Sequence, residues 1–155
     1  MQKRMRQYML WSSIASICFL IILATSCALP AHATDSGLQP GAKVPAFRLK
    51  DQNGNSQTLK SLSGPNGLLI LFNRSADWCP FCKSQLIDLE AARHNFEAKG
   101  IHVASITYDS TEILKSFSVR RNIHYSLLSD PDSSVIDAFG VRNHETEATG
   151  AKSGI

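Results

Sequence analysis

Apolar residues along the chain fall into short runs that are separated by Gly, Pro, Asn and Asp. Residues 47–49 alternate between apolar and polar, Asn53-Gly54 marks a turn, and residues 58–59 resume the apolar pattern, which together predict a β-hairpin. Residues 68–72, Leu-Leu-Ile-Leu-Phe, form an unbroken apolar run between turn signals. Such a run is typical of a strand that is buried on both faces.

The chain after this strand alternates between helix and strand patterns. A helix is predicted from Pro80 to Lys99, because Pro is well tolerated at a first helical position and Gly100 favours a helix end. Its largely apolar face comprises Leu86, Leu89, Arg93 and Phe96, with Ile87 and Ala91 beside them. The later elements are a strand over 101–106, a helix to about 121 that opens with an acidic capping box at 109–112, a strand over 125–128, and a helix over 133–139 that Gly140 ends. Strand, helix and strand at these spacings predict a βαβ unit and an α/β fold with a partly parallel sheet.

The first 33 residues do not follow a domain pattern. Lys3, Arg4 and Arg6 precede an apolar stretch that is densest over 14–24, and the small residues Ala31-His32-Ala33 follow. This order predicts a secretory signal peptide over residues 1–33 with cleavage after Ala33. Two alternatives remain: an uncleaved anchor over 9–29, and lipidation at Cys27, because Ala24-Thr25-Ser26-Cys27 resembles a bacterial lipobox.

Charge changes the picture once this segment is set aside. The chain has 16 Lys and Arg against 13 Asp and Glu, and three of the basic residues lie within residues 1–33. The remainder is therefore neutral, and its composition argues against a nucleic-acid-binding surface, which needs a basic face. We expect a membrane to be involved only through the export signal. The protein is then predicted to be exported, to the periplasm or another extracytoplasmic space, or anchored in the membrane by the retained segment.

The cysteines carry the candidate chemistry. Cys18 and Cys27 lie in the predicted signal, which leaves Cys79 and Cys82 in the sequence Trp78-Cys79-Pro80-Phe81-Cys82. A disulfide between them would close too short a loop to restrict the unfolded chain much, so a redox role is favoured over a structural one. Cys79 precedes the predicted helix, where unpaired N–H groups favour a thiolate, and we expect it to be the more exposed and more acidic thiol.

Other interpretations of the pair are weaker. A zinc site needs four ligands, and the histidines show no ligand spacing, so we expect no metal and no other cofactor. Trp78 and Pro80 are candidate supporting residues: Trp78 as a packing surface beside the sulfurs, and Pro80 as the first residue of the helix. Arg74 and Asp77 flank the pair and are interpreted as surface charges or as an ion pair with each other, with tuning of the thiols as the alternative.

At this point the chain resembles a known family. Residues 41–62 are similar to the lead-in of the peroxiredoxin-like branch of the thioredoxin superfamily, often labelled alkyl hydroperoxide reductase/thiol-specific antioxidant. Residues 68–82 resemble its active-site segment, and 126–131 and 138–141 resemble later landmarks. The resemblance implies a thioredoxin-like redoxin domain over 34–155, with three α/β/α layers, a mixed sheet and an N-terminal hairpin.

The active-site segment departs from the family pattern. Peroxiredoxins carry Pro-x-x-x-Thr-x-x-Cys, and the corresponding positions here are Ser75, Cys79 and Cys82. Cys82 therefore aligns with the peroxide-attacking Cys, whereas the Thr has become Cys79. In the thioredoxin pattern, by contrast, Cys79 attacks and Cys82 resolves. Asn73 stands where thioredoxins often carry a buried carboxylate, so no buried base is evident.

The second departure concerns residues 143–155, which are polar and small and show no strand signal. In this superfamily a strand preceded by a cis-proline, a further strand and a final helix would follow. Without them the fold is expected to be truncated at the C-terminus, with an open sheet edge, marginal stability and a tendency to associate.

The leading functional hypothesis is an exported thiol-disulfide oxidoreductase or antioxidant protein that uses the Cys79 and Cys82 pair. Its expected partners are protein or small-molecule disulfides and thiols, with an upstream thiol reductant. The first alternative is a peroxiredoxin-like thiol peroxidase that reduces hydroperoxides, with Cys82 as the peroxidatic residue. Further alternatives are a non-enzymatic thiol site for a soft metal and an inactive remnant.

Overall fold

A computed structural model describes residues 37–142 of the 155-residue chain. The elements are β1 (Arg48–Asp51), β2 (Ser56–Thr58), α2 (Leu59–Leu62), β3 (Gly67–Phe72), α3 (Pro80–Glu97), β4 (Ile101–Thr107), α4 (Thr111–Arg121), β5 (Ser126–Ser129) and α5 (Ser134–Ala138). The predicted signal over 1–33, its cleavage site, Cys18, Cys27 and the polar stretch over 143–155 lie outside the described residues. Within residues 37–142, no helix combines the length and the apolar character needed to cross a bilayer.

The sheet is mixed, as expected. Its strand order is β2-β1-β5-β4-β3, with β3 parallel to β4 and β4 parallel to β5, while β1 runs antiparallel to both β2 and β5. The parallel register pairs Phe72 with Ile106, so β3 and β4 end side by side at the same edge. The segments that follow these two strands therefore meet, and the redox pair lies in one of them.

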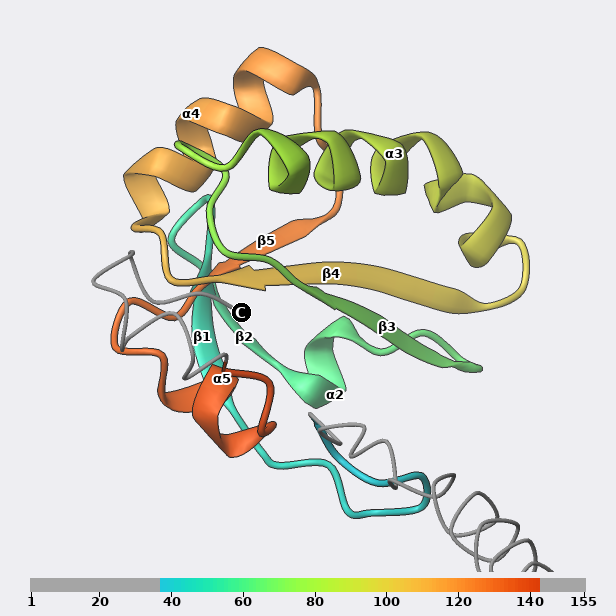
Figure 1. The fold of residues 1–155 in the computed structure, drawn as a ribbon. Coiled ribbons are helices and arrows are strands. Elements are labelled where there is room, and N and C mark those ends of the chain that lie inside the picture. Colours follow the sequence, from blue (N-terminus) through green and yellow to red (C-terminus); the bar gives the residue numbers. More distant parts are fainter. Residues whose placement is uncertain (1–36, 143–155) are drawn as a thin grey trace, which may run out of the picture. The chain divides into compact units, whose positions relative to one another are not determined.

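Helices cover both faces of the sheet, which confirms the three-layer α/β/α arrangement (Figure 1). One face packs against α3 and α4 through a core that includes Leu86, Phe117 and Leu127. The other face packs against α2 and α5 through a core that includes Ile106, Leu128 and Ile136. Each core forms because apolar residues alternate between the two faces of β4 and β5, as the period of a strand requires.

The hairpin is confirmed, but its second arm lies earlier than predicted, at Ser56–Thr58 rather than at residues 58–59. The Asp51 carboxylate accepts hydrogen bonds from the backbone N–H groups of Asn53 and Asn55, and Gly54 has a φ of 81°, which suits glycine. Leu59 does not continue the strand. Thr58 and Ser61 form a capping box that begins the four-residue helix α2 at Leu59.

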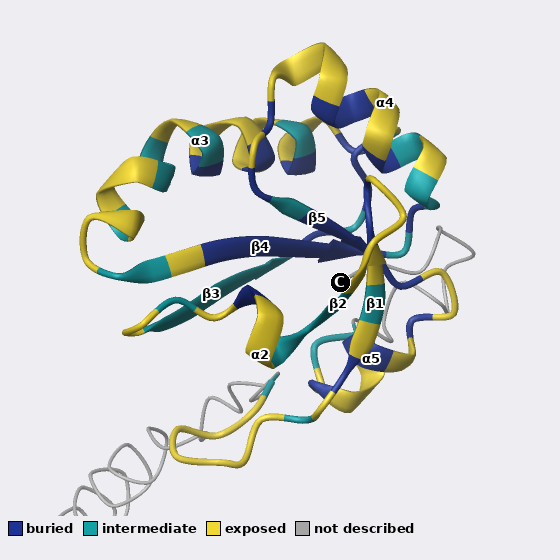
Figure 2. Cartoon of the chain, turned by 180° about the vertical axis from the view of Figure 1, so that it is seen from behind, coloured by how far each residue is buried: buried dark blue, intermediate teal, exposed yellow. Residues whose placement is uncertain are grey.

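The prediction that the apolar strand is buried on both faces is wrong. All six residues of β3 are only half-buried, whereas most of β4 is buried (Figure 2). The physical reason is position: among the described residues β3 pairs only with β4 and forms the edge of the sheet. A continuous apolar run does not distinguish an edge strand from a central one.

The two longer helices lie where predicted, with local corrections. Helix α3 begins at Pro80 and ends at Glu97, and Gly100 takes a φ of 73° just beyond it. Its buried residues are Cys82, Leu86 and Leu89, whereas Ile87 and Ala91 are exposed. Ser110 caps α4 by accepting a hydrogen bond from the Ile113 N–H. The predicted capping role of Asp109 is therefore wrong. Its carboxylate instead accepts hydrogen bonds from the loop before Cys79.

Candidate redox site

Cys79 and Cys82 form a disulfide at the point where β3 has ended and α3 begins, and their Cα atoms are 5.3 Å apart. Both residues are buried: Cys79 is 1% exposed and Cys82 is 5% exposed. In this oxidised state the expectation that Cys79 is the more exposed residue is therefore wrong.

Cys79 is the N-cap residue of α3. Its sulfur accepts a hydrogen bond from the Cys82 backbone N–H at 3.2 Å, and Pro80 follows at the start of the helix. Pro suits this place because its missing N–H has no intrahelical partner there. The N–H contact and the helix macrodipole both favour negative charge on the Cys79 sulfur once the disulfide is reduced.

Arg74 contacts the redox pair directly. Its guanidinium lies 3.9 Å from the Cys79 sulfur and 5.3 Å from the centre of the Trp78 ring. The predicted ion pair between Arg74 and Asp77 is not the contact found, because the half-buried Arg74 turns toward the sulfur. The Trp78 ring is the surface on which the guanidinium stacks.

A buried carboxylate supports the loop before Cys79. Asp109, which is 5% exposed, accepts hydrogen bonds from the Ser75 hydroxyl at 2.8 Å, the Ala76 N–H at 2.6 Å and the Thr107 hydroxyl at 3.1 Å. The Ser75 oxygen in turn accepts the N–H groups of Asp77 and Trp78. Sequence reasoning found no buried carboxylate here. The usable signal was that Asp109 follows β4 closely and that β4 ends beside β3.

Asn73 lies in the core of the site, as its alignment with the thioredoxin carboxylate position implied. It is 3% exposed, donates from its amide to the Gln85 side chain at 2.9 Å, and accepts from the Ser105 hydroxyl at 3.3 Å. These contacts join the loop to α3 and to β4. Asn73 thereby serves as a neutral connector rather than as a base.

Tyr108 is half-buried, and its phenol is influenced by Asp109, Trp78 and Arg74. Burial raises the pKa of Tyr108, and the Asp109 charge raises this pKa further, while Trp78 and Arg74 act in the opposite direction. Its phenol is therefore neutral at physiological pH. The Tyr108 phenol is therefore a polar but uncharged group near the stacked Arg74 and Trp78 side chains.

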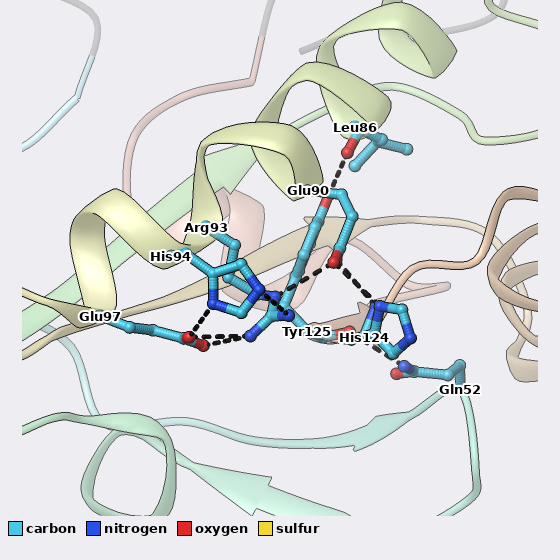
Figure 3. Close-up of polar contacts among 8 residues, drawn as sticks. All are labelled: Gln52, Leu86, Glu90, Arg93, His94, Glu97, His124 and Tyr125. Carbon is cyan, nitrogen blue, oxygen red and sulfur yellow. Dashed lines mark hydrogen bonds and ion pairs between the residues drawn. The ribbon is translucent and has the colours of Figure 1, made fainter.

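A polar network fixes the other end of α3 (Figure 3). The Glu90 carboxylate accepts hydrogen bonds from the His124 backbone N–H and contacts the His124 ring and Arg93. The Tyr125 hydroxyl donates to the Leu86 carbonyl oxygen at 2.9 Å. Burial alone would raise the pKa of Glu90, but the His124 and Arg93 contacts outweigh it and lower the pKa. These contacts hold α3, and with it the redox pair, against the segment before β5.

The described histidines contact oxygen atoms of the protein. Across residues 37–142, no three His, Cys, Asp or Glu side chains gather in a way that could hold a metal ion. His94 and His124 contact carboxylates on α3, and the His102 ring contacts the Leu62 carbonyl oxygen.

The three-layer fold and a Cys-x-x-Cys disulfide at the start of α3 define a thioredoxin-fold redox protein. The model of the AhpC/TSA family matches residues 40–153, and the chain belongs to this family. Among curated relatives, a peroxiredoxin-named protein of Mycobacterium tuberculosis is 35% identical over 103 residues, which cover 66% of this chain and 64% of that protein. Escherichia coli peroxiredoxin Bcp is 30% identical over 104 residues, covering 67% of this chain and 65% of its own length. The chain thus spans just under two thirds of these relatives.

Solved structures agree on the fold. Peroxidoxin BcpB from Mycobacterium tuberculosis aligns with a TM-score of 0.61 and 26% identity over 70% of this chain and 67% of its own. Xanthomonas campestris peroxiredoxin Q aligns with a TM-score of 0.62 and 25% identity over 70% of this chain and 68% of its own. Both confirm the thioredoxin-like fold that the sequence predicted.

Proposed function

We propose that this protein is a thiol peroxidase that reduces hydroperoxides through Cys79 and Cys82. The observation that carries the proposal is the disulfide between the two residues. The resemblance to the family's active-site segment aligns Cys82 with the peroxide-attacking Cys, and Cys79 is the partner with which Cys82 forms the disulfide. The relatives that carry peroxiredoxin names support this alternative over the general thiol-disulfide oxidoreductase that we first favoured.

The cycle begins with reduced cysteines. The Cys82 thiolate attacks the terminal oxygen of a hydroperoxide, a sulfur–oxygen bond forms and the O–O bond breaks. The alkoxide takes a proton from water and leaves as an alcohol, while Cys82 becomes a sulfenic acid. The Cys79 thiolate then attacks the Cys82 sulfur, hydroxide leaves and takes a proton to form water, and the disulfide closes.

A thiol reductant must complete the cycle. Two reductant thiols are oxidised to a disulfide while Cys79 and Cys82 regain their thiols, by way of a mixed disulfide. Because both sulfurs are nearly inaccessible in the disulfide state, the reductant needs local opening of the loop before α3. We propose a dithiol protein or small dithiol as this partner.

A second candidate is disulfide exchange with other proteins, in which Cys79 attacks and Cys82 resolves. The Cys79 position favours it: the sulfur caps α3 and contacts Arg74, as a nucleophile with a stabilised thiolate would. The two candidates use the same pair and differ in which sulfur meets the substrate.

The test compares the two substrates on the reduced full chain. Stopped-flow oxidation by hydrogen peroxide is followed through the fluorescence of Trp78, which directly precedes Cys79 in the chain. The chain has 2 Trp residues, and the Trp78→Phe variant identifies the signal of Trp78. Reduction of insulin disulfides is measured in parallel. The proposal expects rapid single-exponential oxidation by peroxide and slow insulin reduction. The reverse ranking favours disulfide exchange, and failure of both reactions leaves an inactive or metal-binding protein.

We further propose that residues 1–33 export the protein to an extracytoplasmic space such as the periplasm, leaving a redoxin domain over 34–155. The basic start, the apolar middle and Ala31-His32-Ala33 support it. N-terminal sequencing of the mature protein should begin at Thr34. A lipid-modified Cys27 at the N-terminus, or an intact Met1, would replace this proposal with a lipoprotein or an anchored protein.

A further inference from the structure

Arg74 is the charged side chain that reaches the redox pair from the loop after β3. Its guanidinium nitrogen lies 3.9 Å from the Cys79 sulfur, and the guanidinium stacks on the Trp78 ring at 5.3 Å. The residue is half-buried, so its charge acts on the sulfur with less screening than an exposed charge would.

We propose that Arg74 is a catalytic residue that holds the Cys79 sulfur in its thiolate form through direct contact. The inference rests on the proposed function for its place in the cycle and names the residue that tunes one sulfur of the pair. For this side chain the sequence pattern favours a surface charge or an ion pair with Asp77, with tuning of the thiols as the alternative.

Two other charged groups near the loop, Lys83 and Asp109, have partners of their own among the described residues. Lys83 donates from its ammonium group to the Asp77 carbonyl oxygen at 2.7 Å. The Asp109 carboxylate, at the end of β4, is occupied by Ser75, Ala76 and Thr107. Tyr108 is kept neutral by burial. Among the described residues, Arg74 is the cation found in contact with the Cys79 sulfur, and its stacking on the Trp78 ring fixes its position.

A stabilised Cys79 thiolate serves the cycle twice. In the resolving step it is the nucleophile: its sulfur forms a bond to the Cys82 sulfur while the sulfur–oxygen bond of the sulfenic acid breaks and hydroxide leaves. In the reducing step it is the leaving group: a reductant thiolate attacks the Cys82 sulfur, and the electron pair of the disulfide departs with Cys79. Both steps gain from a lower thiol pKa at Cys79, because that shift increases its thiolate population and makes it a better leaving group.

The experiment measures the Cys79 thiol without any peroxide. In the full chain carrying Cys82→Ser, the backbone N–H at position 82 is retained, so the other contact of the Cys79 sulfur stays available. The rate of Cys79 alkylation by iodoacetamide is recorded against pH by peptide mass spectrometry, which separates Cys79 from Cys18 and Cys27. The same measurement is made after adding Arg74→Gln, Arg74→Lys or Arg48→Gln; Arg48 lies on β1, where it is exposed and donates to Ser56.

The proposal expects Arg74→Gln to raise the pH midpoint of alkylation by about one unit, as loss of an adjacent opposite charge does. Arg74→Lys should recover part of the shift, and Arg48→Gln should leave the midpoint unchanged. Equal midpoints in the Arg74→Gln and Arg48→Gln proteins would overturn the proposal. Because alkylation needs no peroxide, this outcome is distinct from a failure of the peroxidase function.

A second readout keeps the test decisive if Arg74→Gln folds poorly. The reduction potential of the Cys79–Cys82 disulfide is measured in the unmodified chain and in Arg74→Met, which loses the charge but keeps a long side chain that can pack on Trp78. A lower potential in Arg74→Met, meaning a more stable disulfide, supports the proposal. An unchanged potential together with an unchanged alkylation midpoint in Arg74→Met contradicts it.

Discussion

The carboxylate of Asp109 accepts a hydrogen bond from the hydroxyl of Ser75 at 2.8 Å, across 34 residues of sequence. This contact joins the segment after β4 to the loop before Cys79. Ser75 stands where the family pattern has Pro. Its hydroxyl oxygen accepts hydrogen bonds from the backbone N–H groups of Asp77 and Trp78, while its O–H donates to the Asp109 carboxylate. A hydrogen-bonded anchor thus fixes the loop where a proline ring would restrict it covalently.

Removal of this anchor should destabilise the protein and loosen the site. Asp109→Ala leaves the Ser75 hydroxyl, the Ala76 N–H and the Thr107 hydroxyl without their shared acceptor, and we expect a loss of about 3 kcal/mol in the free energy of unfolding. Ser75→Ala should cost less, because the other two donors keep their acceptor. Urea unfolding of the full chain provides the measurement, with the exposed Asp88→Ala as the matched control. Equal stability of the Asp109 and Asp88 variants would contradict the anchor.

The burial of α3 predicts opposite outcomes for two of its apolar residues. Leu86 is fully buried and Phe81 is 81% exposed. Leu86→Ala should lower the free energy of unfolding by about 3 kcal/mol through the cavity that it creates. Phe81→Ala should change it by no more than about 0.5 kcal/mol. Denaturant titration tests both, and a large loss at Phe81 would show that its side chain is covered in solution.

Glu90 should make stability depend on acid pH. Burial alone would raise the pKa of Glu90, but the His124 and Arg93 contacts lower it below the ordinary value of 4.5. A carboxylate whose pKa is lowered by folding contributes stability above its unfolded pKa, and this contribution is lost as pH falls through the folded pKa. Glu90→Gln should therefore be less stable than the unmodified chain at neutral pH, by about 1 to 2 kcal/mol.

That difference should shrink as the pH is lowered from about 5 to about 2.5, because Glu90 becomes protonated in the unmodified chain. Urea unfolding at several pH values measures it, with Asp88→Asn as the control for an exposed carboxylate. A constant difference across this pH range would show that the Glu90 charge does not contribute through these contacts.

Local sequence signals predict most of the secondary-structure elements and the position of the redox pair. Apolar runs and turn residues located β3, β4 and β5, and Pro80 and Gly100 bracketed α3 closely, because these signals act within a few residues. Cys79 and Cys82 could be placed at the start of α3 for the same reason. The short helix α2 was missed because its signal is only the pair Thr58 and Ser61.

Contacts between distant segments could not be predicted in this way. Asp109 looked like part of a capping box, and only the parallel register of β3 and β4 brings its carboxylate to Ser75. Arg74 was interpreted as a surface charge because a local sequence does not show which direction a long side chain takes. The half-buried state of β3 likewise depends on which strands pair with it.

The most direct test of the peroxidase proposal asks which sulfur meets the peroxide. Full-chain Cys79→Ser and Cys82→Ser proteins are reduced, treated with equal hydrogen peroxide in the presence of a 1,3-dione that traps sulfenic acids, and mapped by mass spectrometry. The proposal predicts rapid trapping at Cys82 in the Cys79→Ser protein, because no thiol remains there to resolve it, and little trapping at Cys79 in the Cys82→Ser protein. Preferential trapping at Cys79, or none at either residue, would contradict it.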